Sequence, residues 1–291
     1  MSLLSGQKCL ILLQLFVPVL LQAQNHEFGA TGGVTYYLGD LNPITLFKKP
    51  YPAFGVLYKR NLDYHFSLKF HALYGKVGAD DLKSRNGYQH TRNLRFTSPI
   101  LEAAAALEFN FFAFEPGNRK RFFITPFLFF GAGAFYMNPQ VVHNMLVVDL
   151  KALGTEGQNI PEFRRPYRAV QPMFPFGLGL KYNPLKGITL TAEWGMRLTL
   201  TDYLDDVSTV YVDPALLSQY SGKLAVELAD RSRLVFVDNT GRQRGFRYTK
   251  DWYSYAGLHI TFRIANPRSD CWRYRHKYRF PRIFRKKTTT F

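Results

Sequence analysis

The sequence predicts an all-β protein, an eight-stranded antiparallel transmembrane β-barrel with short periplasmic turns and long outer loops. Three observations support this: a period of two in eight segments, the length of these segments, and alternating long and short connections between them. Because side chains alternate across a β-strand, a period of two indicates one apolar and one polar face. A tilted strand needs about 9–11 residues to cross a bilayer, whereas ordinary strands have about 5–6.

The clearest strand is expected at Gly187–Thr199. Its even positions, centred on Trp194, are apolar, and its odd positions include Glu193 and Arg197. The other seven strands are expected at Phe28–Leu38, Ala53–Arg60, Tyr64–Lys76, Ile100–Phe111, Phe122–Met137, Phe174–Tyr182 and Asp251–Ile264. The fifth of the eight is apolar on both faces, so its pattern does not predict which face turns outward.

The connections test this topology independently. Those after the second, fourth and sixth strands are short, and those after the other strands are long. Outer-membrane barrels have an even number of strands, short periplasmic turns and longer outer loops. The topology also places rings at both ends of the apolar face, as in membrane aromatic belts. They are Tyr36, Tyr74, Tyr136 and Trp252 at the outer end, and Tyr58, Tyr64, Phe109 and Tyr182 at the other. A soluble lipocalin-type barrel, with its apolar face inside, is the alternative.

Residues 1–23 have the pattern of a cleavable secretory signal. Lys8 precedes the apolar run Cys9–Leu21, and Ala23 offers a small residue for cleavage. A membrane helix is the alternative, but this run is shorter than about 18 residues and Pro18 interrupts it. We therefore expect an exported protein whose final location is the outer membrane.

A basic tail is predicted at residues 267–291, after a barrel at residues 24–266. The tail interleaves aromatic rings with bases, among them Arg268, Arg273, Arg275, Lys277, Arg279 and Arg282. The topology puts both termini in the periplasm, where no nucleic acid is expected. We therefore expect the tail to bind outer-membrane lipid headgroups or an acidic protein. A disordered solubilising tail is the alternative. Cys271, the cysteine left after cleavage, cannot form a disulfide framework or a cysteine metal site.

The polar strand faces are expected to form a charge network inside the barrel. An eight-stranded barrel has an interior just wide enough to be filled by side chains. The expected network consists of Lys69, Glu102, Glu108, Lys181, Glu193, Arg197, His259 and Arg263. Glu193 and Arg197 lie about 13 Å apart along one strand, so we expect their partners on neighbouring strands. A catalytic Glu–His pair or a histidine metal site is the alternative, but no nucleophile and no short ligand spacing accompany these residues. No catalytic residue and no cofactor is predicted.

The segment Thr201–Asp206 carries three carboxylates just after the seventh strand. Asp202, Asp205 and Asp206 are candidate ligands for a hard cation such as calcium. Their spacing matches no known cation loop, and a solvated loop is the alternative. We therefore predict no metal site.

Six segments resemble the PorG-type outer-membrane family of Bacteroidota. They are Gly32–Pro43, Arg92–Phe96, Phe109–Phe112, Leu153–Gln158, Glu193–Arg197 and Thr201–Ser208. The resemblance implies a small β-barrel of the type IX protein secretion system, which also supports gliding motility in some relatives. It also implies two partners, a periplasmic ring lipoprotein and its partner subunit.

The expected function is therefore a non-enzymatic barrel that anchors this ring through its short turns and basic tail. A passive structural or adhesive barrel of OmpX type is one alternative. A small outer-membrane lipid-modifying enzyme is another, but the predicted lipid-facing positions contain no Ser–His pair.

Overall fold

The computed structural model describes residues 25–118, 123–232 and 237–264. The strands are β1 (Asn25–Leu38), β2 (Tyr51–Asn61), β3 (Phe66–Asp80), β4 (Arg95–Asn110), β5 (Ile124–Met137), β6 (Gln140–His143), β7 (Leu146–Asp149), β8 (Val170–Leu185), β9 (Ile188–Thr199) and β10 (Trp252–Ile264). The helices are η1 (Asp81–Lys83), α2 (Gly87–Arg92), α3 (Leu150–Leu153), α4 (Pro214–Ser221) and α5 (Lys223–Ala229). In these ranges no helix is long and apolar enough to cross a membrane. The predicted signal segment and basic tail lie outside the described residues.

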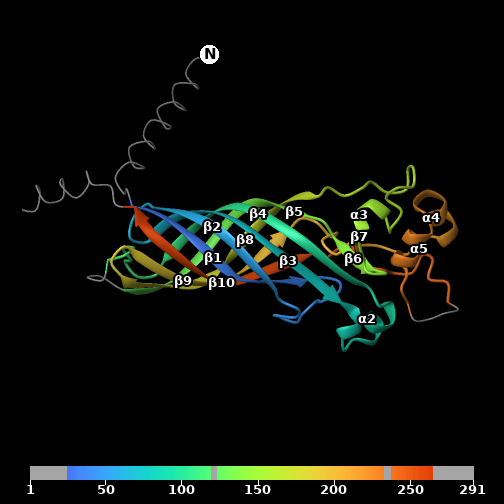
Figure 1. Ribbon diagram of the computed structural model, residues 1–291, viewed down its shortest axis with the longest axis horizontal. Coiled ribbons are helices and arrows are strands. Elements are labelled where there is room, and N and C mark those ends of the chain that lie inside the picture. The colour runs from blue at the N-terminus through green and yellow to red at the C-terminus, as the bar shows by residue number, and fades with distance from the viewer. Residues whose placement is uncertain (1–24, 119–122, 233–236, 265–291) are drawn as a thin grey trace, which may run out of the picture.

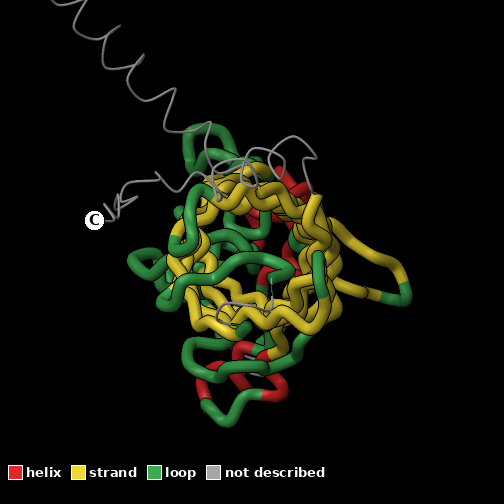
Figure 2. Tube along the Cα trace, turned by 90° about the vertical axis from the view of Figure 1, so that its left-hand side faces the viewer, coloured by secondary structure: helices red, strands yellow, loops and turns green. Residues whose placement is uncertain are grey.

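Eight of these strands close an antiparallel barrel (Figure 1). The order runs from β3 through β2, β1, β10, β9, β8 and β5 to β4, and pairing between β3 and β4 closes the ring. β1 pairs with β10 along its length, from His26 opposite Ile264 to Leu38 opposite Trp252. Seen end-on, the strands form a continuous ring (Figure 2). The predicted fold class is confirmed.

All eight predicted strands are present, although several ends differ. The largest difference is in β3 and β4, which continue their pairing beyond Lys76 and Pro99 to Asp80 opposite Arg95. Tyr64 precedes β3 and lies in a turn, where its carbonyl accepts a hydrogen bond from the Phe114 N–H at 3.0 Å. The length of a strand therefore depends on how far its neighbouring strand continues the hydrogen-bonded pairing, as well as on the apolar pattern.

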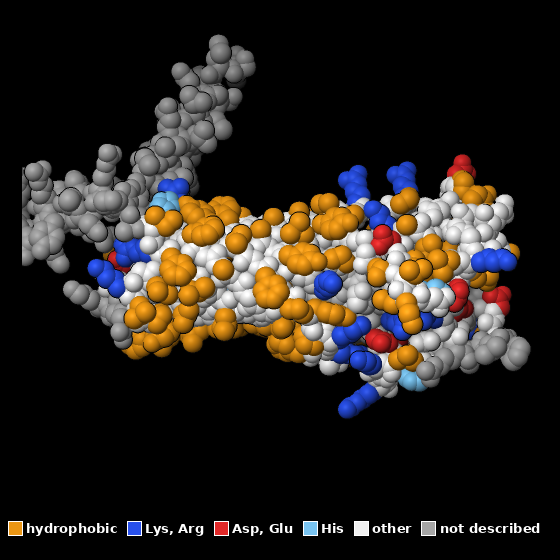
Figure 3. Space-filling model, viewed as in Figure 1, with side chains coloured by type: hydrophobic (Ala, Val, Ile, Leu, Met, Phe, Trp, Pro, Cys, Tyr) orange, Lys and Arg blue, Asp and Glu red, His pale blue; other side chains and the backbone are white. Residues whose placement is uncertain are grey.

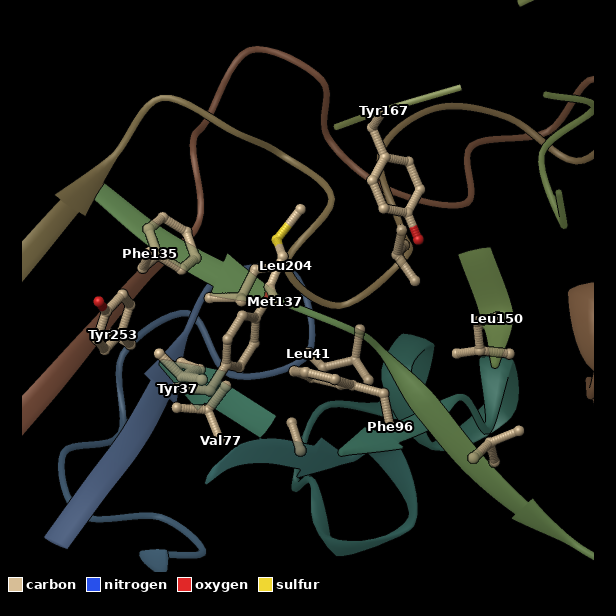
Figure 4. Packing of buried hydrophobic residues seen from close by; sticks show 14 of the residues in the cluster. Tyr37, Leu41, Val77, Phe96, Phe135, Met137, Leu150, Tyr167, Leu204 and Tyr253 are labelled. Carbon is tan, nitrogen blue, oxygen red and sulfur yellow. The ribbon is translucent and has the colours of Figure 1, made fainter. Parts of the chain in front are cut away.

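The long connections, which we expected as loops, fold into a structured cap. We define the cap as residues 39–50, 81–94, 138–169, 200–232 and 237–250. It contains α2 to α5 and the hairpin β6–β7, all gathered at one end of the barrel (Figure 1). The hairpin joins β4 where Gln140 pairs with Thr97. Buried rings and aliphatic side chains from the strands and from the cap form one core (Figure 4).

The outside of the barrel is apolar over most of its length (Figure 3). Its exposed side chains include Phe28, Phe54, Phe70, Leu101, Phe130, Leu178, Leu258 and Phe262. Soluble monomers rarely expose so large an apolar surface. The structure therefore excludes the lipocalin-type alternative, and the chain is a membrane-spanning barrel of the outer-membrane type.

The predicted aromatic belts are present in part: three of their rings are exposed, Tyr36 is buried, and the others, Tyr58, Tyr64, Phe109 and Trp252, are half-buried. Tyr74 is 51% exposed, Tyr136 43% and Tyr182 38%. Tyr36 is instead buried, because the ring of Phe47 packs on it with 4.7 Å between centroids. Trp194 Nε1 also donates a hydrogen bond to the Tyr36 hydroxyl at 2.9 Å. The prediction of an exposed Tyr36 was wrong because the first connection folds back over the barrel wall.

Candidate functional site

Three lysines surround one carboxylate inside the barrel. Lys59 Nζ lies 3.1 Å from Glu108 Oε1, and Lys181 Nζ lies 2.6 Å from Glu108 Oε2. Lys69 Nζ is 3.6 Å from Glu108 Oε1. The four residues come from β2, β3, β4 and β8, and none is more than 3% exposed. These contacts tie four strands together through the lumen.

Glu102 and Glu193 extend this network toward the cap. Lys69 pairs with Glu193 as well as with Glu108. Arg197 Nη2 lies 3.4 Å from Glu102 Oε1, and Tyr253 donates a hydrogen bond to Glu102 Oε2 at 2.7 Å. His71 Nε2 lies 2.9 Å from Glu102 Oε1, and His259 Nε2 lies 3.9 Å from Glu193 Oε2. The lumen is thus filled by side chains that contact one another.

The expectation that Glu193 and Arg197 find their partners on neighbouring strands was wrong. Arg197 Nη2 lies 4.0 Å from Glu193 Oε1. The spacing of about 13 Å applies to the backbone, and two long side chains span much of it. The nearer carboxylate to Arg197 is Glu102 on β4, which is not a neighbour of β9 in the sheet. Contacts therefore cross the lumen and are not confined to adjacent strands.

Two inward rings on β5 complete the lumen network. Lys69 Nζ lies 4.2 Å from the centroid of Phe129, and Lys181 Nζ lies 4.7 Å from that of Phe127. An ammonium group over an aromatic face is attracted by the ring quadrupole. Gly195 leaves room for one ring, because a Cβ there would lie 2.5 Å from Phe129 Cζ. The sequence pattern could not identify these rings, since β5 is apolar on both faces.

Two further charged residues of the lumen were not predicted from the sequence. Lys59 occupies an inward position of β2, so the alternation itself could have identified it. Glu27 lies one residue before the predicted start of the first strand, and it accepts hydrogen bonds from Asn61 Nδ2 at 2.8 Å and Thr261 Oγ1 at 2.5 Å. With these two, the described lumen balances its charges. Its carboxylates are Glu27, Glu102, Glu108 and Glu193, and its permanent cations are Lys59, Lys69, Lys181 and Arg197.

Arg263 lies at the end of the barrel opposite the cap, away from the central network. Its Nη1 is 3.3 Å from Glu115 Oε1 and donates a hydrogen bond to the Pro116 carbonyl at 3.2 Å. Glu115 belongs to the turn after β4. This turn folds into the barrel mouth, where the Gly117 N–H donates to Asn183 Oδ1 at 3.0 Å. Arg263 therefore helps to close this end.

The three carboxylates of the acidic segment are buried, so the solvated-loop alternative was wrong. Asp202 accepts a hydrogen bond from Ser208 Oγ at 2.6 Å. Asp206 accepts one from Tyr167 Oη at 2.8 Å, and Tyr167 belongs to a different connection. Packing between the two connections removes the segment from water. Within the described ranges, no group of three or more His, Cys, Asp or Glu side chains is arranged to hold a metal ion.

This burial changes the protonation of the segment. It raises the pKa of Asp202 to about 7 and the pKa of Asp206 to about 6. Burial also raises the pKa of both Asp205 and Asp251 well above the usual range. Tyr37 Oη lies 2.6 Å from Asp205 Oδ2 and 2.7 Å from Asp251 Oδ1. Because a phenol has one proton, both contacts can be hydrogen bonds only when one of the two carboxyl groups is protonated.

A chain of polar contacts links the four connections that make up the cap. Arg92 Nη2 donates to the Asp40 carbonyl at 3.1 Å, and Arg92 Nη1 donates to the Arg244 carbonyl at 2.7 Å. Arg244 Nη1 donates to Glu156 Oε1 at 2.9 Å and to the Asp206 carbonyl at 2.6 Å. Except for Arg244, these residues belong to segments that carry the family resemblance. Figure 4 shows the apolar side of this junction, with Tyr37, Leu41, Tyr167 and Leu204. These segments meet in one buried structural junction.

Sequence and structure comparisons relate the chain to known proteins. A family described as "Domain of unknown function (DUF6089)" matches residues 7–212. No curated protein sequence matches significantly. Among solved structures, Ail, the attachment invasion locus protein of Yersinia pestis, is similar at 9% identity with a TM-score of 0.40, over 84% of this chain and 100% of that one. Neisserial surface protein A is similar at 8% identity with a TM-score of 0.38, over 82% and 97%. The N-terminal β-barrel domain of Pseudomonas aeruginosa OprF is similar at 14% identity with a TM-score of 0.33, over 84% and 100%.

Proposed function

The chain belongs to the DUF6089 family and forms an outer-membrane β-barrel, and we propose that it anchors a periplasmic protein-secretion assembly, that of the type IX system. In this proposal the barrel has no enzymatic role. Its partners are a periplasmic ring lipoprotein and the partner subunit of that lipoprotein. Gliding motility depends on the barrel only in organisms where the same secretion system supports gliding.

One observation supports an anchoring role above all others, the filled lumen. Lys59, Lys69 and Lys181 converge on Glu108 with almost no exposure to solvent. A lumen filled in this way leaves no path for a substrate or a secreted chain. The protein would therefore bind its partners through its outer surface or through its two ends.

The end opposite the cap suits a docking surface. The turn after β4 packs into the barrel mouth through Gly117 and Asn183, and β8 and β9 are joined by a short turn at Lys186 and Gly187. The last described residue, Ile264, pairs with His26 at this same end. The basic tail at residues 267–291 therefore follows directly from the end that we assign to the periplasm.

Deletion of residues 267–291 tests the proposal. We expect loss of cargo secretion and loss of the ring proteins from membrane pull-downs, while the barrel itself still inserts. A matched pair of full-length variants separates charge from length. In one, Arg273, Arg275 and Arg279 are changed to Gln, and in the other the same residues are changed to Lys. The Lys variant should retain ring recovery and the Gln variant should lose most of it. Normal secretion and ring recovery after the deletion would contradict the proposal.

A second candidate function is adhesion through the cap, because hairpin β6–β7 exposes apolar side chains. Met145 is 98% exposed, Leu146 70% and Val147 64%. Such side chains mark interaction surfaces. If the hairpin is adhesive, Met145→Asp with Leu146→Asp should abolish attachment to host or neighbouring cells and leave secretion intact. The same double substitution should leave attachment unchanged if anchoring is the only role.

A further inference from the structure

A group of basic side chains lies where the apolar band of the barrel ends and the cap begins. In Figure 3, Lys and Arg side chains gather at this boundary. On the side of β2, β3 and β4 the bases are Lys49, Lys76, Lys83 and Arg95, which we call the basic rim. Lys76, Lys83 and Arg95 are exposed, and Lys49 is half-buried.

The strand register fixes the depth of the basic rim. Lys76 lies two residues beyond Tyr74 on the same outward face of β3, and it pairs with Pro99 on β4. Tyr74 is 51% exposed, and its partner Phe54 on β2 is 64% exposed. Exposed tyrosines occupy the membrane–water interface. The rim therefore begins two residues beyond the aromatic belt along β3, at the level of lipid headgroups.

The bases of the rim lie close to one another and to few acids. Tyr51 is within electrostatic reach of Lys76, Lys83 and Asp80. Lys49 Nζ lies 5.7 Å from the centroid of the same ring. Burial lowers the pKa of Lys49, which Arg95 lowers further while Asp80 raises it. Asp80 is thus the acid that faces this group.

Within the part of the chain that the structure describes, the rim cations differ from the buried cations in having no ion-pair partner. Arg92 and Arg244 pair with Asp81 and Glu156 at 2.8 Å and 2.9 Å. Among the described residues, no carboxylate oxygen lies within 4.0 Å of a rim nitrogen, whereas every ion pair found involves other bases. The rim therefore presents positive charge that the protein does not neutralise.

Hairpin β6–β7 borders the rim and supplies apolar groups beside it. Arg95 Nη2 donates a hydrogen bond to the Val142 carbonyl at 2.9 Å, which places the hairpin next to the bases. Val142 is 53% exposed and Met145 is 98% exposed. A surface with unneutralised bases beside exposed apolar side chains is complementary to a lipid headgroup that carries phosphate above acyl chains.

From this placement we propose that the basic rim binds the phosphate groups of an anionic lipid in the outer leaflet of the membrane. Lys76 and Lys83 contact the phosphate, Lys49 approaches it from the first connection, and Arg95 holds the hairpin over the same lipid. The site rests on the proposed membrane location and not on the secretion role. Its effect is to fix the height and rotation of the barrel in the membrane.

The test compares lipid retention by three forms of the full-length protein. The rim variant carries Lys49→Gln, Lys76→Gln and Lys83→Gln. The control variant removes the same charge elsewhere, through Lys186→Gln, Lys223→Gln and Arg242→Gln, which are exposed positions away from the rim. Each form is mixed with phosphorylated lipid A or with the same lipid dephosphorylated, and bound lipid is counted by native mass spectrometry.

We expect the unaltered protein and the control variant to prefer the phosphorylated lipid. The rim variant should bind it at least about tenfold more weakly, because three bases that attract the anionic headgroup have been removed. Equal retention of the two lipids by the unaltered protein, an equal loss in the control variant, or displacement of the lipid by inorganic phosphate alone would overturn the proposal.

Bilayer insertion is scored separately, by protease protection of the reconstituted barrel. A protein that fails to insert counts against the outer-membrane assignment itself. An inserted protein without phosphate preference counts only against the rim site.

Discussion

Glu108 is the side chain on which the lumen network depends most, because its one carboxylate contacts three ammonium groups. Glu108→Gln leaves Lys59, Lys69 and Lys181 close together without their shared counter-charge. Removing one partner of a buried ion pair costs about 3–5 kcal/mol. We expect a loss of that size in the free energy of unfolding, measured by urea titration of the barrel in lipid vesicles.

The control for this substitution is Glu227→Gln. The Glu227 side chain is 64% exposed, and its nearest base is His143 at 3.6 Å. A change at such a surface position is expected to stay within about 0.5 kcal/mol. If the two variants unfold at the same urea concentration, the lumen network does not stabilise the barrel as described.

Gly195 gives a second test at the scale of a residue. A Cβ at this position would lie 2.5 Å from Phe129 Cζ and 3.0 Å from Arg197 Nη1. Because the lumen is packed, Gly195→Ala should cost about 1–3 kcal/mol. Gly32→Ala is the matched control, since its Cβ would meet only Phe54 Cδ1, at 3.8 Å. Equal urea midpoints for the two variants would show that Phe129 moves aside easily.

The alternation of apolar and polar residues predicted which side chains line the lumen only in strands whose two faces differ in polarity. Glu108 and Lys181 sit on clearly polar faces, so a period of two locates them. Phe129 could not be located in this way, because both faces of β5 are apolar. The contact between Glu193 and Arg197 depends on side-chain conformations that spacing along a strand does not determine.

At the scale of elements, the strands could be predicted and most of the cap could not. Each barrel strand repeats one pattern, whereas the cap elements are short. Some local signals were present. Asp213 caps α4 by accepting a hydrogen bond from the Ala215 N–H at 2.8 Å, with Pro214 in the first turn. The burial of Asp206 had no local signal, because Thr155 and Tyr167 come from another connection.

The folded cap should become less stable as pH rises. Its pKa values of about 7 for Asp202 and about 6 for Asp206 exceed the usual aspartate value of about 3.9. A carboxyl group whose pKa is raised by folding stabilises the fold fully below its unfolded pKa, and this contribution is lost as pH rises through the folded value. We expect amide hydrogen exchange in the cap, corrected for its intrinsic pH dependence, to accelerate between about pH 5 and 8.

The barrel strands serve as an internal reference for this measurement, since their exchange should change little. Asp202→Asn should reduce the acceleration, because an amide does not ionise. Asp238→Asn, at an exposed position, should leave it unchanged. Equal exchange in the cap at pH 5 and pH 8 would contradict the protonation that we assign to the buried carboxyls.

At the scale of the molecule, the charge is distributed unevenly between inside and outside. The chain has a formal net charge of +17, while the permanent charges of the described lumen balance. The excess positive charge therefore lies outside the lumen. At the cap end of the barrel it includes the basic rim, and in the sequence it includes the basic residues of 267–291, which lie outside the described residues. Both features suit a barrel that is held by lipid on one side and by an acidic or lipid partner on the other.

A filled lumen leaves the outer surface and the two ends of the barrel as the parts that can bind partners. Ion conductance of the full-length protein in a planar bilayer shows whether the lumen is closed. With insertion verified by protease protection, we expect no conductance steps above the leak of the bare bilayer, because the paired lumen charges and the packed ends block passage. Reproducible single-channel steps from the unaltered protein would show that the lumen is open and would contradict the filled barrel described here.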